Sequence, residues 1–145
     1  MKSSQQEIFL NHEAKGLYKI VLDIEKYPEF IPWCNKIIII SKSKNELLAD
    51  MIVSYKYFLP QIFTSHVFFN SNKLIINTNY VKGPLKDLKT EWYFEKLEDN
   101  KTKILFNIKF EFQKFLHQKL AEFFFDLIEN QMIDSFKKRA DEILD

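Results

Sequence analysis

Residues 115–144 read FLHQKLAEFFFDLIENQMIDSFKKRADEIL, and this stretch decides how the chain folds. It has no Gly or Pro, it is rich in good helix formers, and its apolar residues recur at helical spacing. The pattern predicts one helix, roughly 45 Å long at about 1.5 Å per residue. A domain of this size has a radius of gyration of only about 15 Å. Such a helix therefore crosses the molecule, and the rest of the chain must be arranged around it.

The apolar surface of this predicted helix is wider than one packing face needs. An ordinary surface helix shows an apolar stripe of about 100° or a little more, whereas Ala121 and Phe125 lie outside the main stripe here. A curved sheet that touches the helix on two sides would cover this surplus. The alternative is that part of the surplus lines a ligand cavity or meets a membrane or a second subunit.

Composition limits the possible classes of protein. One domain over residues 1–145 is expected, because no linker or low-complexity stretch interrupts the chain. The net charge of +1 argues against a DNA-binding protein, which needs clustered cations. A single cysteine, Cys34, excludes an internal disulfide. Without a signal peptide or a spanning segment, we expect a cytoplasmic bacterial protein that is at most peripheral to the inner membrane.

Turn residues divide the first 112 residues into short segments. A strand is predicted over 3–10, followed by a helix over 12–24 with Asn11 as its N-cap. From residue 35 the apolar residues alternate, as is typical of strands. Their connections are short, so the strands form antiparallel hairpins. Six such strands are predicted, over 36–42, 47–56, 61–69, 73–80, 88–97 and 103–112.

The last two predicted strands each have one apolar face. Trp92 and Phe94 share a face with Leu88 and Thr90, and Phe110 continues the apolar face of the final strand. The order of strand, helix, short helical elbow, six strands and long helix predicts an α+β fold. In this fold a curved seven-stranded antiparallel sheet wraps around the C-terminal helix. An elongated apolar cavity is expected between sheet and helix.

Residues 27–34, YPEFIPWC, form a rigid aromatic elbow between the first helix and the strands. Its two prolines prevent a long helix and predict extended backbone at Tyr27 and Ile31. The elbow is therefore a turn or a one-turn helix with large apolar side chains. It is either a structural plug over one end of the core or a lip over a cavity.

Residues 83–88, GPLKDL, form a second unusual segment. Gly83 and Pro84 predict a turn, and Lys86 and Lys89 place positive charge beside Leu85, which we expect to be exposed. The segment is either a plain strand connection or a mobile lip whose lysines meet anionic lipid headgroups.

No catalytic constellation is visible in the sequence. The histidines His12, His66 and His117 lie on different predicted elements and lack metal-ligand spacing. Cys34 has no motif that ties it to a base, and the acidic residues alternate with lysines on predicted solvent faces. We therefore expect no enzyme activity, no metal site and no cofactor other than a bound ligand.

The two unusual segments resemble signatures of one family. Residues 27–34 resemble the Y-x-x-F-L-P-W-C signature of the coenzyme Q-binding family of START-like domains, within the polyketide cyclase superfamily. That family also includes the bacterial ribosome-association toxin proteins. Residues 83–94 resemble its G-P-F-K-x-L-x-x-x-W-x-F segment. Ile31 stands where Leu is usual, and Leu85 where Phe is usual. The end of the chain agrees as well, in Phe110-Glu111-Phe112, Ser135-Phe136 and Arg139-Ala140.

The resemblance implies a helix-grip fold whose cavity holds a hydrophobic ligand. The candidate is ubiquinone, carried without catalysis in support of respiratory electron transport and with transient membrane contact. Near the ligand headgroup, Thr90, Tyr55, Asn77 or His66 could donate hydrogen bonds. The predicted ligand-binding residues are Pro32, Trp33, Leu85, Lys86, Leu88 and Trp92 from the signatures, and Phe94, Phe110 and Phe124 from the apolar faces.

Two other functions stay open at this point. A ribosome-binding regulator, the other branch of the same family, would act on a ribosomal subunit through an exposed basic surface. An enzyme related to the aromatic polyketide cyclases would need convergent polar residues inside the cavity, and the predicted inward faces are mainly apolar. The basic surface could include Lys42, Lys44, Lys137, Lys138 and Arg139.

Overall fold

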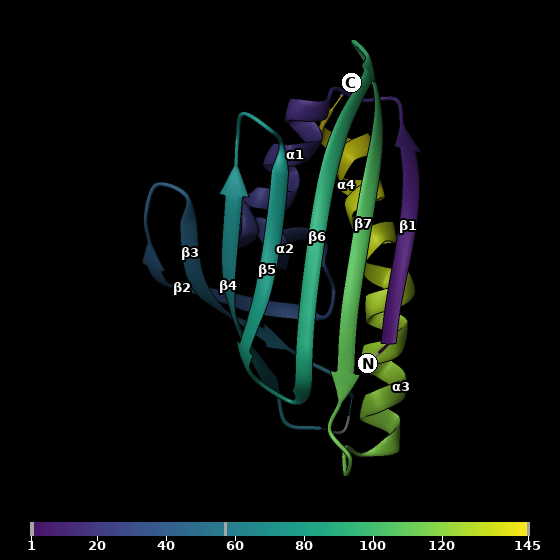
Figure 1. Cartoon of the computed structure of the whole chain (residues 1–145). Helices are drawn as coiled ribbons and strands as arrows, with labels where there is room; N and C mark the ends of the chain where they lie inside the picture. Colours follow the sequence, from purple (N-terminus) through teal and green to yellow (C-terminus); the bar gives the residue numbers. More distant parts are fainter. Residues whose placement is uncertain (1, 57, 145) are drawn as a thin grey trace.

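A computed structural model describes residues 2–56 and 58–144 of the chain, and in it a curved sheet holds a long C-terminal helix against its inner face (Figure 1). The described residues form one seven-stranded sheet in the order β1-β7-β6-β5-β4-β3-β2, with antiparallel neighbours throughout. The predicted α+β helix-grip fold is confirmed. In chain order the elements are β1 (Lys2–Leu10), α1 (Ala14–Leu22), the 3₁₀ helix η1 (Ile24–Lys26), α2 (Tyr27–Phe30), β2 (Cys34–Lys42), β3 (Glu46–Val53), β4 (Gln61–Asn70), β5 (Ile75–Lys82), β6 (Leu85–Glu98), β7 (Lys101–Phe112), α3 (Gln118–Asp126), the π-helical turn η2 (Leu127–Gln131) and α4 (Met132–Ile143).

The core lies between the inner face of the sheet and the helices, as the alternation in the last strands predicts. Thr90, Trp92 and Phe94 of β6 are buried, whereas Glu95 at the end of their run is exposed. On β7, Phe106 and its inward neighbours are almost completely buried. These faces meet the C-terminal helix and α1, which lie side by side behind the sheet (Figure 1).

The predicted C-terminal helix is present, but it is shorter and less regular than expected. His117 is its N-cap, because the His117 Nδ1 accepts the Lys119 backbone N–H at 3.1 Å. Phe115 therefore lies outside the helix, with 91% of its surface exposed. The π-helical turn η2 separates α3 from α4. Its wider hydrogen-bonding ring offsets the two halves, which agrees with the different directions of their apolar sides.

The prediction that the first helix begins at His12 behind an Asn11 cap is wrong. The helix starts at Ala14, with Glu13 at the N-cap position. The reason is tertiary: the His12 carbonyl oxygen accepts the Thr102 hydroxyl at 2.7 Å, and the His12 Nε2 lies 2.8 Å from an Asp141 carboxylate oxygen. These contacts to β7 and α4 hold His12 outside the helix.

The aromatic elbow is a single helical turn, as predicted, but its backbone differs at one of the two positions before proline. Ile31 is extended, with φ −108° and ψ 107°. Tyr27 instead has helical angles, φ −53° and ψ −40°. The Tyr27 hydroxyl donates to the Val21 carbonyl oxygen, and its ring lies 5.2 Å from that of Phe136. These contacts override the local preference of a residue that precedes proline.

The expectation that Leu85 is exposed is also wrong. Leu85 is the first residue of β6 and only 2% of its surface is exposed. The Tyr80 hydroxyl accepts the Leu85 backbone N–H at 2.9 Å and donates to the Leu85 carbonyl oxygen at 3.0 Å. These two hydrogen bonds to one phenol hydroxyl fix the turn between β5 and β6. The segment is therefore a tight strand connection.

Gly83 in this turn is expected to be intolerant of a side chain. Its φ is 155°, and a Cβ there would lie 2.6 Å from the Tyr80 hydroxyl oxygen and 2.8 Å from the Ile62 carbonyl oxygen. Gly83→Ala should lower the free energy of unfolding by about 2 kcal/mol, as measured by urea denaturation.

Gly16→Ala is the matched control for this substitution. A Cβ at Gly16 would meet only the end of the Leu144 side chain, at 3.2 Å. The gain in helix propensity of about 1 kcal/mol should offset that contact. An equal loss of stability in both variants would contradict the account of the turn.

Candidate ligand-binding cavity

A cavity of about 120 Å³ lies between the inner face of the sheet and the helical elements. Its wall is formed by α1, η1 and the elbow on one side, by β2 to β6 on the other, and by the start of α4. The wall is mainly aromatic and aliphatic, as the sequence predicts for this position. The lining residues are Val21, Ile24, Tyr27, Ile31, Trp33, Ile37, Ala49, Met51, Phe63, Ser65, Val67, Ile76, Thr78, Leu88, Thr90, Trp92, Met132 and Phe136.

The aromatic elbow contributes one end of this wall. Tyr27, Ile31 and Trp33 all border the cavity. Ile31 and Trp33 are buried, at 1% and 6% exposure, so the elbow also closes the core. The elbow therefore does both things that were weighed for it: it closes one end of the core and it forms part of the cavity wall.

Three hydroxyl-bearing residues lie on the sheet side of the cavity. Ser65 on β4, Thr78 on β5 and Thr90 on β6 line it from adjacent strands. Thr78 and Thr90 are direct cross-strand partners. Ser65 stands opposite Tyr80, which makes it a diagonal neighbour of Thr78. The sheet thus places a short polar row in an otherwise apolar wall.

The indole N–H of Trp33 is the second polar feature. Among the described residues, its Nε1 is one of four buried side-chain N or O atoms without a hydrogen-bond partner. A buried donor left unpaired costs about 1–3 kcal/mol. Trp33 borders the cavity, so a bound molecule that brought an acceptor oxygen to this nitrogen would satisfy the donor.

The structure brings some of the predicted ligand-binding residues to the cavity and leaves others away from it. Trp33, Leu88 and Trp92 border it. Phe94 does not border it, but it is buried and its ring stacks on that of Trp92, with the centroids 6.0 Å apart. The roles of these residues in ligand binding stay predictions.

The remaining predicted residues do not border the cavity. Phe124 contacts the cavity residue Phe63 at 5.4 Å from behind the wall. Phe110 is buried near Phe125. Pro32 is exposed, and Leu85 is held in the turn described above. Lys86 lies at the surface, where its Nζ is 2.9 Å from a Glu111 carboxylate oxygen.

Of the four predicted hydrogen-bond donors to a headgroup, only Thr90 lines the cavity. His66 and Asn77 are adjacent in sequence to the lining residues Ser65 and Thr78, so they lie on the outer face of the sheet. Tyr55 stacks on Phe123 at 4.3 Å, nearer to α3. The sequence did not lead us to predict Ser65 and Thr78 as cavity residues. Their alternation with the apolar residues Phe63, Val67 and Ile76 was the signal that could have found them.

The cavity wall has no group suited to acid–base or nucleophilic chemistry at neutral pH. Among the described residues that line it, there is no Asp, Glu, His, Lys, Arg or Cys. Burial raises the pKa of Tyr27 far above its ordinary value. No group of three or more His, Cys, Asp or Glu residues within the described chain could hold a metal ion. The arrangement favours binding over reaction.

The fold and the cavity together define a helix-grip protein that encloses an apolar binding site. A family model described as "Polyketide cyclase / dehydrase and lipid transport" matches residues 10–137. The chain belongs to this START-like family. No helix in the described part of the chain has the length and apolar character that crossing a membrane requires.

Named relatives include ribosome association toxins and a coenzyme Q-binding protein. A protein of Rickettsia prowazekii named ribosome association toxin RatA is 31% identical over 147 residues, which cover 99% of each chain. RatA of Escherichia coli K12 is 32% identical and covers 91% of this chain and 82% of its own. The mitochondrial coenzyme Q-binding protein COQ10 homolog B of Xenopus laevis is 29% identical over 92% of this chain and 56% of its own.

Solved structures share the fold at low sequence identity. The Zhui aromatase/cyclase from Streptomyces sp. R1128 has a TM-score of 0.83 at 13% identity, covering 97% of this chain and 93% of its own. A START superfamily protein from Mycobacterium smegmatis has a TM-score of 0.81 at 13% identity, covering 97% and 98%. At this identity the likeness extends to the fold alone.

Cys34 should be inert in the folded protein. It is 3% exposed, and burial raises the pKa of its thiol to about 11. At neutral pH the group is therefore a thiol rather than the reactive thiolate. Iodoacetamide should leave the native protein unmodified, as read by mass spectrometry, and should label the same protein in urea. Stoichiometric labelling of the folded chain would contradict this assignment.

Proposed function

We propose that this protein binds a polyprenyl quinone, with ubiquinone as the first candidate, and carries it without chemical change. The observation that carries this proposal is that one aromatic cavity is lined both by Trp33, whose indole N–H is unpaired, and by the hydroxyl row of the sheet. A quinone ring is flat and has two carbonyl oxygens that accept hydrogen bonds. It needs donors at its edge and apolar or aromatic contact on its faces.

The cavity offers both kinds of contact. The rings of Trp92, Phe63 and Phe136 belong to its wall, and offset or edge-on ring contacts each contribute about 0.5–1.5 kcal/mol beyond their buried area. Trp33 approaches from the elbow, while the hydroxyls of Thr78 and Thr90 approach from the sheet. Donors on two opposing walls suit a ring with two acceptor oxygens.

The isoprenoid tail needs only apolar surroundings. Its transfer from water is favourable by about 25 cal/mol per Å² of apolar surface buried. A cavity of about 120 Å³ is below the usual range of roughly 300–1,000 Å³ for ligand pockets. It suits the ring, and the tail requires the neighbouring apolar side chains to move apart.

A carrier role accords with the absence of reactive groups in the described wall. Acid–base catalysis needs a titratable side chain within hydrogen-bond reach of the reacting atoms. The lining contains hydroxyls and an indole, which bind and orient. We therefore assign binding rather than cyclase activity to this site.

Association with a ribosomal subunit is a second candidate, because relatives named for it match the chain over almost its full length. Two of the five basic residues expected to serve this role form ion pairs with carboxylates. Lys138 pairs with Asp134 at 3.1 Å, and Arg139 pairs with Glu29 at 3.2 Å. Cosedimentation of the protein with ribosomal subunits tests this candidate.

The quinone proposal is tested by filling the cavity. Ala49 lines it from β3, so Ala49→Leu places additional carbon atoms where the ligand ring would lie. The wild-type protein, purified under native conditions from a host that makes ubiquinone, should release that quinone on solvent extraction, as read by mass spectrometry. The variant should release about tenfold less, since each 1.4 kcal/mol of lost affinity is a factor of ten.

Ala121→Leu on α3 is the matched control, because Ala121 does not border the cavity. It should retain the quinone content of the wild type. A wild-type protein that releases no quinone, or equal content in the Ala49→Leu variant, would reject the proposal. Ribosome cosedimentation of an empty protein would favour the second candidate.

A further inference from the structure

Two apolar side chains project into solvent from loops at one end of the molecule. Leu59, between β3 and β4, is 83% exposed, and Phe115, between β7 and α3, is 91% exposed. The two loops are in contact, because the ring centroids of Phe58 and His117 lie 5.0 Å apart. We call this end the 59/115 tip. Among the described residues these are the two most exposed large apolar side chains, and their position on touching loops marks this end as a candidate interaction surface.

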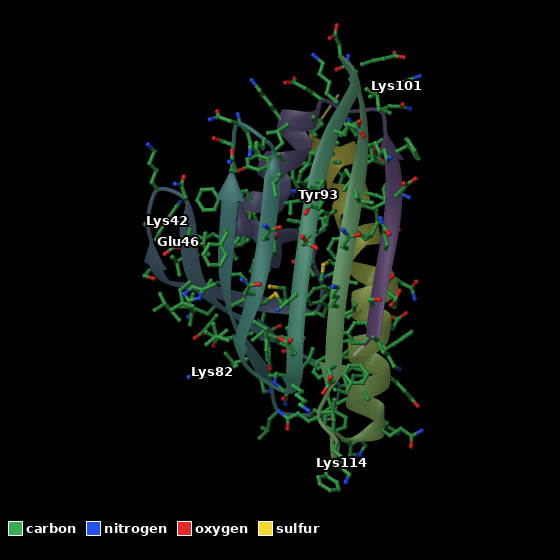
Figure 2. All side chains as sticks on the ribbon, viewed as in Figure 1. Lys42, Glu46, Lys82, Tyr93, Lys101 and Lys114 are labelled. Carbon is green, nitrogen blue, oxygen red and sulfur yellow. The ribbon has the colours of Figure 1, made fainter. Side chains whose placement is uncertain are left out.

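The surroundings of the 59/115 tip are cationic. Lys56 and Lys114 flank the two apolar residues in their loops, and Lys119 follows in the first turn of α3. All three are exposed, and none has an ion-pair partner in the described chain. Lys82 lies at the same end (Figure 2). The Lys114 Nζ lies 5.5 Å from the centroid of the Phe115 ring. The tip therefore combines two apolar side chains with lysines that form no ion pair in the described chain.

The opposite end of the sheet has a different character. Lys101 marks it in Figure 2. The turn that precedes Lys101 contains Glu98 and Asp99, and Asp99 pairs with Lys96 at 3.3 Å. Charges of both signs balance there. The combination of protruding apolar groups and excess cations is thus specific to the 59/115 tip.

We propose that the 59/115 tip docks on the surface of a bilayer that contains anionic lipid. Leu59 and Phe115 would enter the interface, while the lysines meet the lipid headgroups. Isolated side chains on projecting loops suit a fluid surface that closes around each of them. Phe115 offers one ring for stacking on a nucleic-acid base, but Leu59 offers none, so the pair suits a lipid interface better than RNA.

A continuous series of rings joins the tip to the ligand cavity. From the cavity residue Phe63, contacts lead to Phe124, Phe123, Tyr55 and Phe58, with successive ring centroids 4.3 to 5.7 Å apart. Phe58 in turn is next to Leu59. Ligand exchange through this end rests on the carrier function proposed above, whereas docking on a bilayer does not.

Vesicle cosedimentation tests the docking. The wild-type protein should bind vesicles made of equal parts phosphatidylglycerol and phosphatidylcholine, and binding should weaken with added NaCl because salt screens the lysines. Leu59→Ser and Phe115→Ser should each weaken it by about tenfold, and the double variant Leu59→Ser/Phe115→Ser should weaken it further. The matched control is Phe9→Ser with Leu97→Ser, two residues of the same types near the opposite end that are 63% and 46% exposed. The control should bind as the wild type does, and far-UV circular dichroism should show that all variants are folded.

Each outcome decides the proposal. Absence of vesicle binding by the wild type, or an equal loss in the control, would overturn it. If the Leu59→Ser/Phe115→Ser variant no longer binds ribosomal subunits but still binds vesicles, the tip would be a ribosome contact instead. Vesicle binding through the tip by a protein that yields no quinone would preserve this inference and reject the carrier function.

Discussion

The ring of Phe136 joins the three parts of the fold on which the cavity depends. From α4 it contacts Tyr27 and Phe30 of the elbow at 5.2 and 5.6 Å, and Trp92 of the sheet at 5.3 Å. One side chain thus fixes how far the C-terminal helix stands from the sheet at this point. Beside this contact the side chains of the sheet and helices leave a cavity of about 120 Å³ unfilled.

The cavity is compatible with stability because most of its wall is apolar and is supported from behind. Trp92 lies against Phe106 at 4.4 Å, and Phe63 lies against Phe124. The unpaired Trp33 N–H is the exception. Under the proposed function, its desolvation cost is borne by the empty protein and would be removed by a ligand oxygen that accepts the bond. The same feature therefore lowers the stability of the free protein and favours a ligand with an acceptor at that position.

The sequence predicted the fold well because its strongest patterns are local and periodic. The meander and the inward face of β6 followed from alternation, and the long helix followed from residues 115–144. Its first turn was misplaced because Phe115 looks like part of the apolar stripe, whereas the His117 cap excludes it. Leu85 was misjudged because its burial depends on the Tyr80 hydroxyl, a contact that no local pattern reveals.

The site was less predictable than the fold. Trp33 and Trp92 came from the family resemblance, and the structure places both at the cavity. Ser65 was missed because β4 has large apolar residues on both faces, such as Ile62 and Phe63, which hides its alternation. The unpaired state of the Trp33 N–H could not be read from sequence, since it depends on what every neighbouring element leaves unfilled.

The central claim, that Trp33 donates to a ligand oxygen, is most directly tested by NMR of the indole N–H groups. The chain has two tryptophans, so a ¹H–¹⁵N spectrum contains two indole signals, which Trp33→Phe assigns. Titration with a short-chain ubiquinone should move the Trp33 indole proton downfield, as a new hydrogen bond requires. A Trp33 signal that stays unchanged while the quinone binds would contradict the account.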